Sequence, residues 1–323
     1  MTRITRRSAV ALLAAASAGR TLAQGAYPNR TVRWIIPYAA GGGSDAIART
    51  IQPALQRELG QPVVIENKPG AASAIAAAEV ARSAPDGYTI FSADNGTLVY
   101  NPALFKKLSY DPKEFAPVSL LARAPTILVA GPATQAKDVK ELIAQIKAEN
   151  GKFAYASAGT GSPHAMAMEM FKSQTGVNMI HVPYRGGALS LADVAAGQVP
   201  ITMSDYSGGG GMIRGGKVRP LAVADSRRIP QLPDVPTFAE LGYPGVLAEA
   251  FAGIVVPVRT PPEVIARLQA AVQAAVRDPQ VNAKLVEIGQ QPVGGTPQQF
   301  TAVLQQEIPR WHKLIKELNI SLD

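Results

Sequence analysis

Short apolar runs alternate along the chain with longer segments in which apolar residues recur every three or four positions. The short runs are rich in valine, isoleucine and aromatic residues, and they predict strands at 31–38, 62–67, 87–93, 124–132, 152–158, 200–205 and 218–224. The longer periodic segments predict helices at 44–59, 74–84, 138–150, 188–197, 261–278 and 296–318, and a further helix after residue 162. Strands and helices that alternate in this way are typical of an α/β protein.

The segment 44–59 shows the helical pattern plainly. Its large apolar residues lie four apart and would share one face: Ile47, Ile51, Leu55 and Leu59. Gly60 follows as a helix stop. Pro53 lies inside the segment and removes a backbone hydrogen bond, so we expect a kink or a broken turn there.

The first 23 residues differ from the rest of the chain. They begin with basic residues, continue with an apolar run over 9–18 and end in the small-residue stretch 21–23. This order predicts a secretory signal for general export, removed near Ala23, and the apolar run is too short to span a bilayer. The expected location of the mature protein is the periplasm.

Removing this segment halves the net charge. The whole chain carries 32 basic and 24 acidic residues, for a net charge of +8. Four of the arginines lie in 1–23 together with no acidic residue, so the mature chain has 28 − 24 = +4. A charge of that size suits small anionic ligands, and no basic arm indicates nucleic acid. The chain has no cysteine and only three histidines, none in a His-x-x-x-His pair, so we expect no metal and no cofactor.

Two junctions between a predicted strand and a predicted helix share one design. Three glycines, 41–43, precede Ser44, and Gly159 and Gly161 precede Ser162. Each serine is a candidate N-cap, and Pro163 suits the first helical position. Glycines let the backbone approach a ligand closely, and the unpaired N–H groups of a first helical turn favour a carboxylate or phosphate. Together the junctions predict an anion held between them.

Two other kinds of site fit the junctions less well. Ser157 lacks the first glycine of a Gly-x-Ser-x-Gly nucleophile motif, and Ser162 is better placed to cap its helix than to attack a carbonyl. His164 lies in a first helical turn, where the helix dipole disfavours its protonation. An exported serine hydrolase that uses Ser157 or Ser162 with His164 therefore stays the alternative. The phosphate-binding Gly-x4-Gly-Lys pattern is absent from both junctions.

Eight motifs in collinear order resemble one known family. Among them are "YPNRTVRWIIPYAAGGGSD", "VVIENKPGAAS", "YASAGTGSPHAMAMEMF", "HVPYRGGALSLADVAAGQV" and "RPLAVADSRRIPQLPDVPTFAELG". The chain is similar over its whole mature length to the substrate-binding proteins of tripartite tricarboxylate transporters, the Bordetella-uptake-gene type of periplasmic receptor.

The resemblance implies a fold and a function. The fold is a two-lobed periplasmic binding protein, or Venus flytrap, with a ligand cleft between two α/β domains. Residues 27–123 plus 250–323 would form one lobe and 124–249 the other. The receptor would be monomeric and non-catalytic. It would capture a small mono- or dicarboxylate, aliphatic or aromatic, and present it to membrane transporter subunits or to a sensor kinase.

The resemblance implies that the family's ligand-binding positions carry over to residues of both glycine junctions and to three positions outside them. They are Tyr38, Gly42, Ser44, Asp45, Asn95, Ser157, Ala158, Gly159, Thr160, Gly161, Ser162, His164, Tyr184 and Asp205. Asp45 has a second role open to it, which is to stabilise its helix end, and His164 is expected to pack behind the site. Tyr184 and Asp205 have structural alternatives as well. The four glycines of 208–211 depart from the family pattern beside Asp205, so no relative's ligand can be assumed for this chain.

Overall fold

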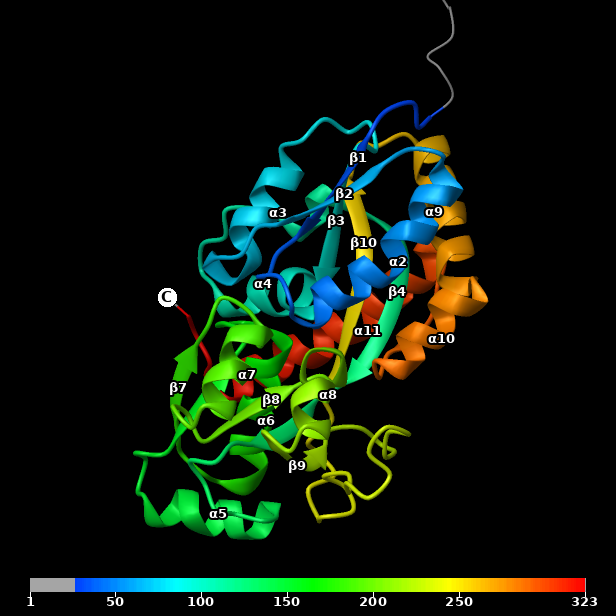
Figure 1. Cartoon of the computed structure of the whole chain (residues 1–323). Coiled ribbons are helices and arrows are strands. Elements are labelled where there is room, and N and C mark those ends of the chain that lie inside the picture. Colours follow the sequence, from blue (N-terminus) through cyan, green and yellow to red (C-terminus); the bar gives the residue numbers. More distant parts are fainter. Residues whose placement is uncertain (1–26, 323) are drawn as a thin grey trace, which may run out of the picture.

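The computed structural model describes residues 27–322, so the predicted export signal at 1–23 lies outside the described residues. Within this range the chain forms two β-sheets, each covered by helices (Figure 1). The first sheet has six strands in the order β11 (Gln291–Pro292), β4 (Phe115–Pro125), β10 (Glu249–Pro257), β3 (Thr89–Asp94), β1 (Val32–Ile36) and β2 (Val63–Asn67). The second has five in the order β7 (Ile180–Pro183), β6 (Ala154–Ser157), β8 (Ile201–Ser204), β5 (Ile127–Ala130) and β9 (Arg219–Val223).

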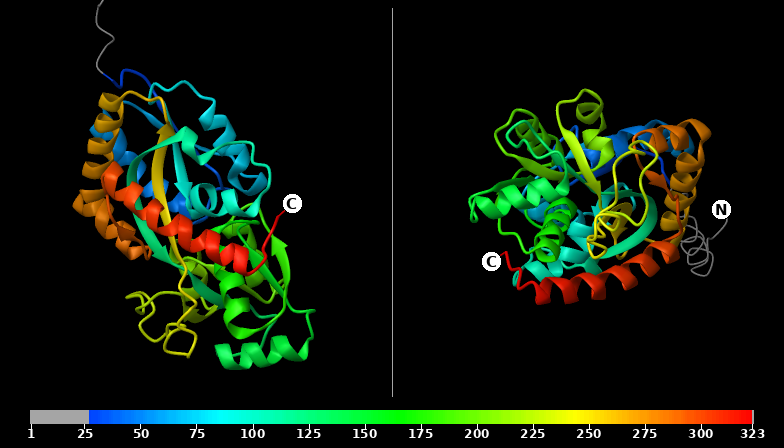
Figure 2. Two further views of the ribbon diagram at one scale, coloured as in Figure 1. Left: turned by 180° about the vertical axis from the view of Figure 1, so that it is seen from behind. Right: turned by 90° about the horizontal axis from the view of Figure 1, so that it is seen from below.

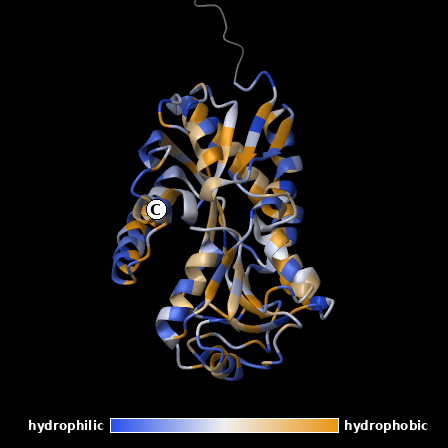
Figure 3. Cartoon of the chain, turned by 90° about the vertical axis from the view of Figure 1, so that its left-hand side faces the viewer, coloured by the Kyte–Doolittle hydropathy of each residue, from blue (hydrophilic) through white to orange (hydrophobic). Residues whose placement is uncertain are grey.

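The helices divide in the same way between the two sheets. The first sheet is accompanied by α2 (Gly43–Leu59), α3 (Ala74–Ala81), α4 (Asn101–Leu104), α9 (Pro262–Arg277), α10 (Pro279–Glu287) and α11 (Pro297–Glu317). The second is accompanied by α5 (Val139–Ala148), α6 (Pro163–Thr175), α7 (Gly187–Ala195) and α8 (Tyr206–Arg214). Short helices lie at η1 (Ala71–Ser73), η2 (Gly96–Tyr100) and η3 (Pro112–Glu114). In Figure 3 the apolar residues gather in the strands and the inner faces of the helices. No described helix combines the length and the apolar character that a membrane span requires.

The chain crosses between the sheets twice, on neighbouring strands. β4 and β10 pair antiparallel, with Ala124 opposite Ala250. β4 ends at Pro125 and β5 begins two residues later in the second sheet, and the chain returns from the second sheet at Glu249. The lobe limits at 123/124 and 249/250 stay a prediction, and the change of sheet lies close to both.

Helix α2 forms as its pattern predicts, but it begins earlier than expected. The four apolar residues of the predicted stripe are all buried. Gly42 occupies the N-cap position with an extended backbone, and its carbonyl accepts from Ala46 N at 2.9 Å. The prediction that Ser44 caps this helix is therefore wrong. The broken turn expected at Pro53 is also wrong, because the helix continues through it. Pro53 lies on the exposed face, where water can satisfy the carbonyl that loses its partner.

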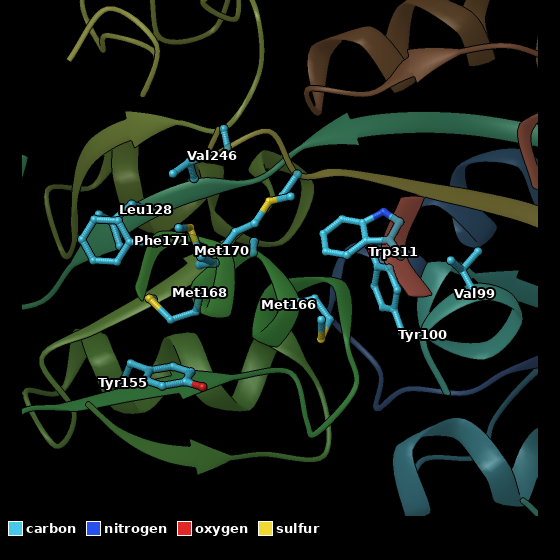
Figure 4. Close-up of a cluster of buried hydrophobic side chains, with 14 of the residues drawn as sticks. Val99, Tyr100, Leu128, Tyr155, Met166, Met168, Met170, Phe171, Val246 and Trp311 are labelled. Atoms are coloured by element: carbon cyan, nitrogen blue, oxygen red, sulfur yellow. The ribbon is translucent and has the colours of Figure 1, made fainter. Parts of the chain in front are cut away.

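One hydrophobic cluster joins the two lobes. Figure 4 shows Trp311 of α11 and Tyr100 of η2 on one side and the methionines of α6 on the other. The Trp311 and Tyr100 rings are in edge contact, with centroids 4.6 Å apart. Helix α11 runs from the first lobe along the rear of the molecule toward the second (Figure 2). The cluster therefore packs the lobes together on one side of the cleft.

Candidate functional site

The first glycine junction is held in shape by the carboxylate of Asp45. Its oxygens accept hydrogen bonds from Gly41 N (2.9 Å), Arg49 Nε (2.8 Å) and Asn67 Nδ2 (3.0 Å). Burial alone would raise the pKa of the Asp45 carboxyl, but these donors bring it below its usual value. Asp45 lines neither cavity described below, so its side chain orders the loop that leads into α2.

The second junction forms as the sequence predicts. Ser162 caps α6, its hydroxyl oxygen accepting from Ala165 N at 3.2 Å, and Pro163 takes the first helical position. Gly159 and Gly161 have φ values of +125° and +71°, a region that side chains disfavour. These two glycines are therefore required by the shape of the loop itself.

The hydroxyl of Ser157 is engaged with a different histidine from the one that the hydrolase hypothesis requires. Ser157 is fully buried, and its Oγ lies 2.6 Å from His181 Nε2. The His181 ring stacks on Tyr155 at 4.7 Å, and burial lowers the pKa of His181. His164 instead contacts Asp205. The pairing of Ser157 or Ser162 with His164 as a base is therefore wrong, because Ser157 pairs with His181, Ser162 caps α6, and Nε2 of His164 contacts Asp205.

Four helices from both lobes begin around one small inner cavity of about 60 Å³. The first turns of α2 and of α6, α7 and α8 contribute Ser44, His164, Gly187 and Ser207 to its wall. Gly43 and Ile47 of α2 and Pro163 of α6 also line it. The remaining lining residues come from strands and nearby loops: Tyr38, Gly42, Asp94, Ala124, Ala158, Asp205, Ala250, Phe251, Ala252 and Gln290. The N–H groups of a first turn have no acceptor within the helix and carry partial positive charge, so the helix starts add positive potential to a wall that also contains the carboxyl groups of Asp94 and Asp205.

A larger outer cavity of about 430 Å³ adjoins the inner one. Tyr38 and Ala158 line both. The outer cavity lies between 69–73 and 75 of the first lobe and 158–162 and 183–185 of the second. It brings in the predicted residues Thr160 and Tyr184, with Arg185 beside them. Tyr184 is tied to its own lobe, because its hydroxyl donates to Asp193 Oδ2 at 2.6 Å.

Asp205 closes the inner cavity from the second lobe. Its carboxylate accepts from Gly208 N at 2.7 Å, from the Ser207 hydroxyl and from His164 Nε2 at 3.1 Å. Burial would raise the pKa of Asp205, but the hydrogen bonds from these three donors and the nearby His164 ring lower it to about 2. The carboxylate lies against Gly43 of the other lobe, where a Cβ atom would be 2.5 Å from Oδ1. In Figure 1 the lower end of α2 accordingly lies beside α7 and α8.

Direct hydrogen bonds also join the lobes around the cleft. Ala39 N donates to Arg185 O at 3.2 Å, and Gln290 Nε2 donates to Ser207 Oγ at 3.1 Å. The structure is therefore a closed arrangement of the two lobes.

Sequence reasoning missed several residues of this site. Asp94, whose carboxylate accepts from the Tyr38 hydroxyl at 2.5 Å, ends the strand β3 and could have been found by its position. Ser207 and Gln290 had no local signal, since they meet only because the lobes close. Asn95, expected in the cleft, lies outside both lining sets. Its Oδ1 accepts from Phe251 N at 2.8 Å, so it supports β10.

Comparisons with known proteins agree with this architecture. The sequence profile described as tripartite tricarboxylate transporter family receptor matches residues 47–320. The protein BugT of Bordetella pertussis is 34% identical over 298 residues, which cover 92% of this chain and 91% of BugT.

Three solved structures are similar over nearly their whole length. Periplasmic binding protein BugD has a TM-score of 0.88 and 32% identity, covering 91% of this chain and 99% of that one. Rpa4515 of R. palustris, solved with adipate, has a TM-score of 0.88 and 34% identity, covering 91% of this chain and 99% of that one. MatC of Rhodopseudomonas palustris, solved with bound malate, has a TM-score of 0.86 and 34% identity, covering 90% of this chain and 100% of that one. The chain therefore belongs to the tripartite tricarboxylate transporter receptor family, whose members are periplasmic solute-binding proteins and not enzymes.

Proposed function

We propose that this receptor captures a small carboxylate between its lobes and delivers it to the membrane subunits of a tripartite tricarboxylate-type transporter. One observation carries the proposal: the first turns of α2 and α6, from opposite lobes, line the same inner cavity, and α7 and α8 begin there too. A carboxylate in this cavity would face N–H groups of both lobes, so its binding would favour the closed arrangement.

The sizes and charges of the two cavities support a ligand that occupies both. The inner cavity has room for one small group, such as a carboxylate with its neighbouring carbon. The outer cavity is several times larger and has Arg185 among its lining residues. A second carboxylate near Arg185 would gain a charged hydrogen-bond donor. Adipate and malate, the acids named with the two similar R. palustris structures, are both dicarboxylates.

The residues proposed to hold the ligand follow from this placement. Ser44 and the N–H groups of 42–44 would bind the inner carboxylate from the first lobe, and His164 and Ala158 would bound it from the second. Thr160 and the glycine loop around it would line the path of the ligand body. Removal of 1–23 near Ala23 belongs to the same proposal, since a periplasmic receptor must be exported.

Calorimetry and thermal unfolding of the purified mature protein test the proposal. The panel contains adipate, succinate, malate, benzoate and the dimethyl ester of each dicarboxylate. At least one free acid should bind and its ester should not, because an ester cannot accept the same donors. A ligand at 100 times its Kd adds about 2.7 kcal/mol to the free energy of unfolding. Equal binding of acid and ester, or no binding by any acid, would refute the proposal.

Ser44→Ala tests the site itself. Losing one hydroxyl donor to a charged group should weaken binding by about 1.5–3 kcal/mol, or roughly ten- to hundredfold in Kd. Ser173→Ala is the matched control, because Ser173 is exposed on α6 and lines neither cavity. Its affinity should equal that of the wild type. An unchanged affinity of Ser44→Ala would place the inner carboxylate elsewhere.

A further inference from the structure

A third cavity, which we call the rear cavity, adjoins the inner cavity and has a volume of about 310 Å³. Residues 225 and 227–231, after β9, line it from the second lobe, and residues 286 and 289–292, from the end of α10 onward, line it from the first. In Figure 1 the end of α10 and the segment after β9 lie on the right, whereas α3 and β7, which contribute to the outer cavity, lie on the left. The small inner cavity therefore lies between two larger ones.

The side chain of Gln290 divides the inner cavity from the rear cavity. Within 27–322 it is the one residue that lines both, and the outer and rear cavities share no lining residue. Gln290 is 4% exposed, and its Nε2 donates to Ser207 Oγ of the other lobe at 3.1 Å. The Ser207 hydroxyl in turn donates to the carboxylate of Asp205. These two bonds hold the Gln290 side chain in place across the closed cleft.

The proposed ligand leaves the inner cavity on the opposite side. Tyr38 and Ala158 line both the inner and the outer cavity, so the body of the acid would pass beside them. The inner cavity, at about 60 Å³, is filled by the carboxylate and the carbon next to it. A second chain on that carbon would need room in another direction. The rear cavity has this room, but the Gln290 side chain stands between it and the carboxylate.

We infer that Gln290 is a specificity-determining residue, which limits this receptor to acids without an alkyl branch on the carbon next to the inner carboxylate. This inference rests on the proposed function, since it places a carboxylate in the inner cavity. A branch would overlap the Gln290 side chain, or displace it and break its bond to Ser207. Overlap in a closely packed site weakens binding, because the surrounding side chains have little freedom to move. A shorter residue at position 290 would join the inner and rear cavities.

Pairs of acids that differ by such branches test the inference on the wild-type protein. Calorimetry compares adipate with 2,5-dimethyladipate, succinate with 2,3-dimethylsuccinate, and pentanoate with 2-propylpentanoate. Every carboxylate of the second acid has a branched neighbour, so the ligand cannot avoid the branch by turning round. Wherever the unbranched acid binds, the branched one should bind roughly 5- to 150-fold more weakly. Equal or tighter binding of the branched acid would overturn the inference and leave the proposed function intact, whereas binding by none of the acids would remove both.

Three variants locate the effect at Gln290. Gln290→Ala removes the partition, so the branched acid should regain affinity and the ratio of affinities within a pair should fall to about one. Gln290→Met keeps a side chain of similar length that cannot donate to Ser207, so its ratio should stay at the wild-type value. Gln291→Ala is the matched control, because Gln291 lines the rear cavity and not the inner one. A wild-type ratio in Gln290→Ala, or the same fall in Gln290→Met or Gln291→Ala, would overturn the assignment.

The ratio within a pair separates selection of the ligand from closure of the lobes. Gln290→Ala and Gln290→Met both lose the hydrogen bond to Ser207, so each should bind the unbranched acids roughly three- to tenfold less tightly than the wild type. That common loss cancels when the two acids of a pair are compared on one protein. Circular dichroism and urea unfolding check that the variants are folded. The comparison of acids on the wild-type protein does not depend on the folding of any variant.

Discussion

Replacing Gly43 by alanine should weaken ligand binding by blocking closure of the lobes. Gly43 is the first residue of α2, and its backbone does not need a positive φ. A Cβ atom there would lie 2.5 and 2.6 Å from the two carboxylate oxygens of Asp205 in the other lobe. The substitution therefore adds one methyl group at the point where the lobes meet, without straining the helix that carries it.

The size of the effect follows from how firmly Asp205 is held. Ordinary contact begins near 3.4 Å, so one side must move by about 3.4 − 2.5 = 0.9 Å. The carboxylate is hydrogen-bonded to His164, Ser207 and Gly208 N, so moving it would break these bonds. An added methyl group in a tightly packed site costs about 1–3 kcal/mol. The Kd should rise by roughly 5- to 150-fold.

Calorimetry with the tightest-binding acid, beside small-angle scattering with and without that acid, measures both consequences. The variant should bind more weakly, and its shape should change less on binding. Gly211→Ala is the control, since a Cβ atom at Gly211 meets nothing within 4 Å. Circular dichroism should show the same fold in all three proteins. If Gly43→Ala binds and closes like the wild type, the contact between Asp205 and α2 does not belong to the ligand-bound state.

Two further predictions concern stability. Ser162→Ala should lower the free energy of unfolding by about 1 kcal/mol in urea, because it removes the cap of α6, whereas Ser44→Ala should not, since Gly42 caps α2. The pKa of Asp205 is about 2 in the folded protein and 3.8 in the unfolded chain, so its ionisation stabilises the fold. This contribution to the free energy of unfolding is complete at a pH above 3.8 and is lost as the pH falls to about 2. Asp205→Asn should reduce the loss of unfolding free energy between pH 4 and pH 2 by about 2 kcal/mol. If the free energy of unfolding of the variant depends on pH in the same way as that of the wild type, the assigned pKa is refuted.

Local features of the sequence determined the elements that carry the site. The stripe of apolar residues in 44–59 predicted α2, and Ser162 with Pro163 predicted the start of α6, because capping and periodicity depend on residues only a few positions apart. The glycines of 159–161 likewise marked a loop whose backbone needs positive φ. The choice of Ser44 as a cap failed because any of several residues after three glycines can begin a helix, and only the packed backbone selects Gly42.

Only the tertiary structure decided which of these elements meet. β4 and β10, which the apolar pattern did not predict as strands, pair antiparallel and cross between the sheets, although prolines interrupt β4 at both ends of its run. His164 contacts Asp205, which is 41 positions away in the sequence, and Ser157 contacts His181, which is 24 positions away. These two pairs depend on the order of strands in the second sheet, whereas the contacts of Gly43 with Asp205 and of Gln290 with Ser207 depend on how the lobes close. A residue's neighbours in sequence contain no information about either, so the close approach of Gly43 to Asp205 between the lobes could be recognised only once the chain was folded.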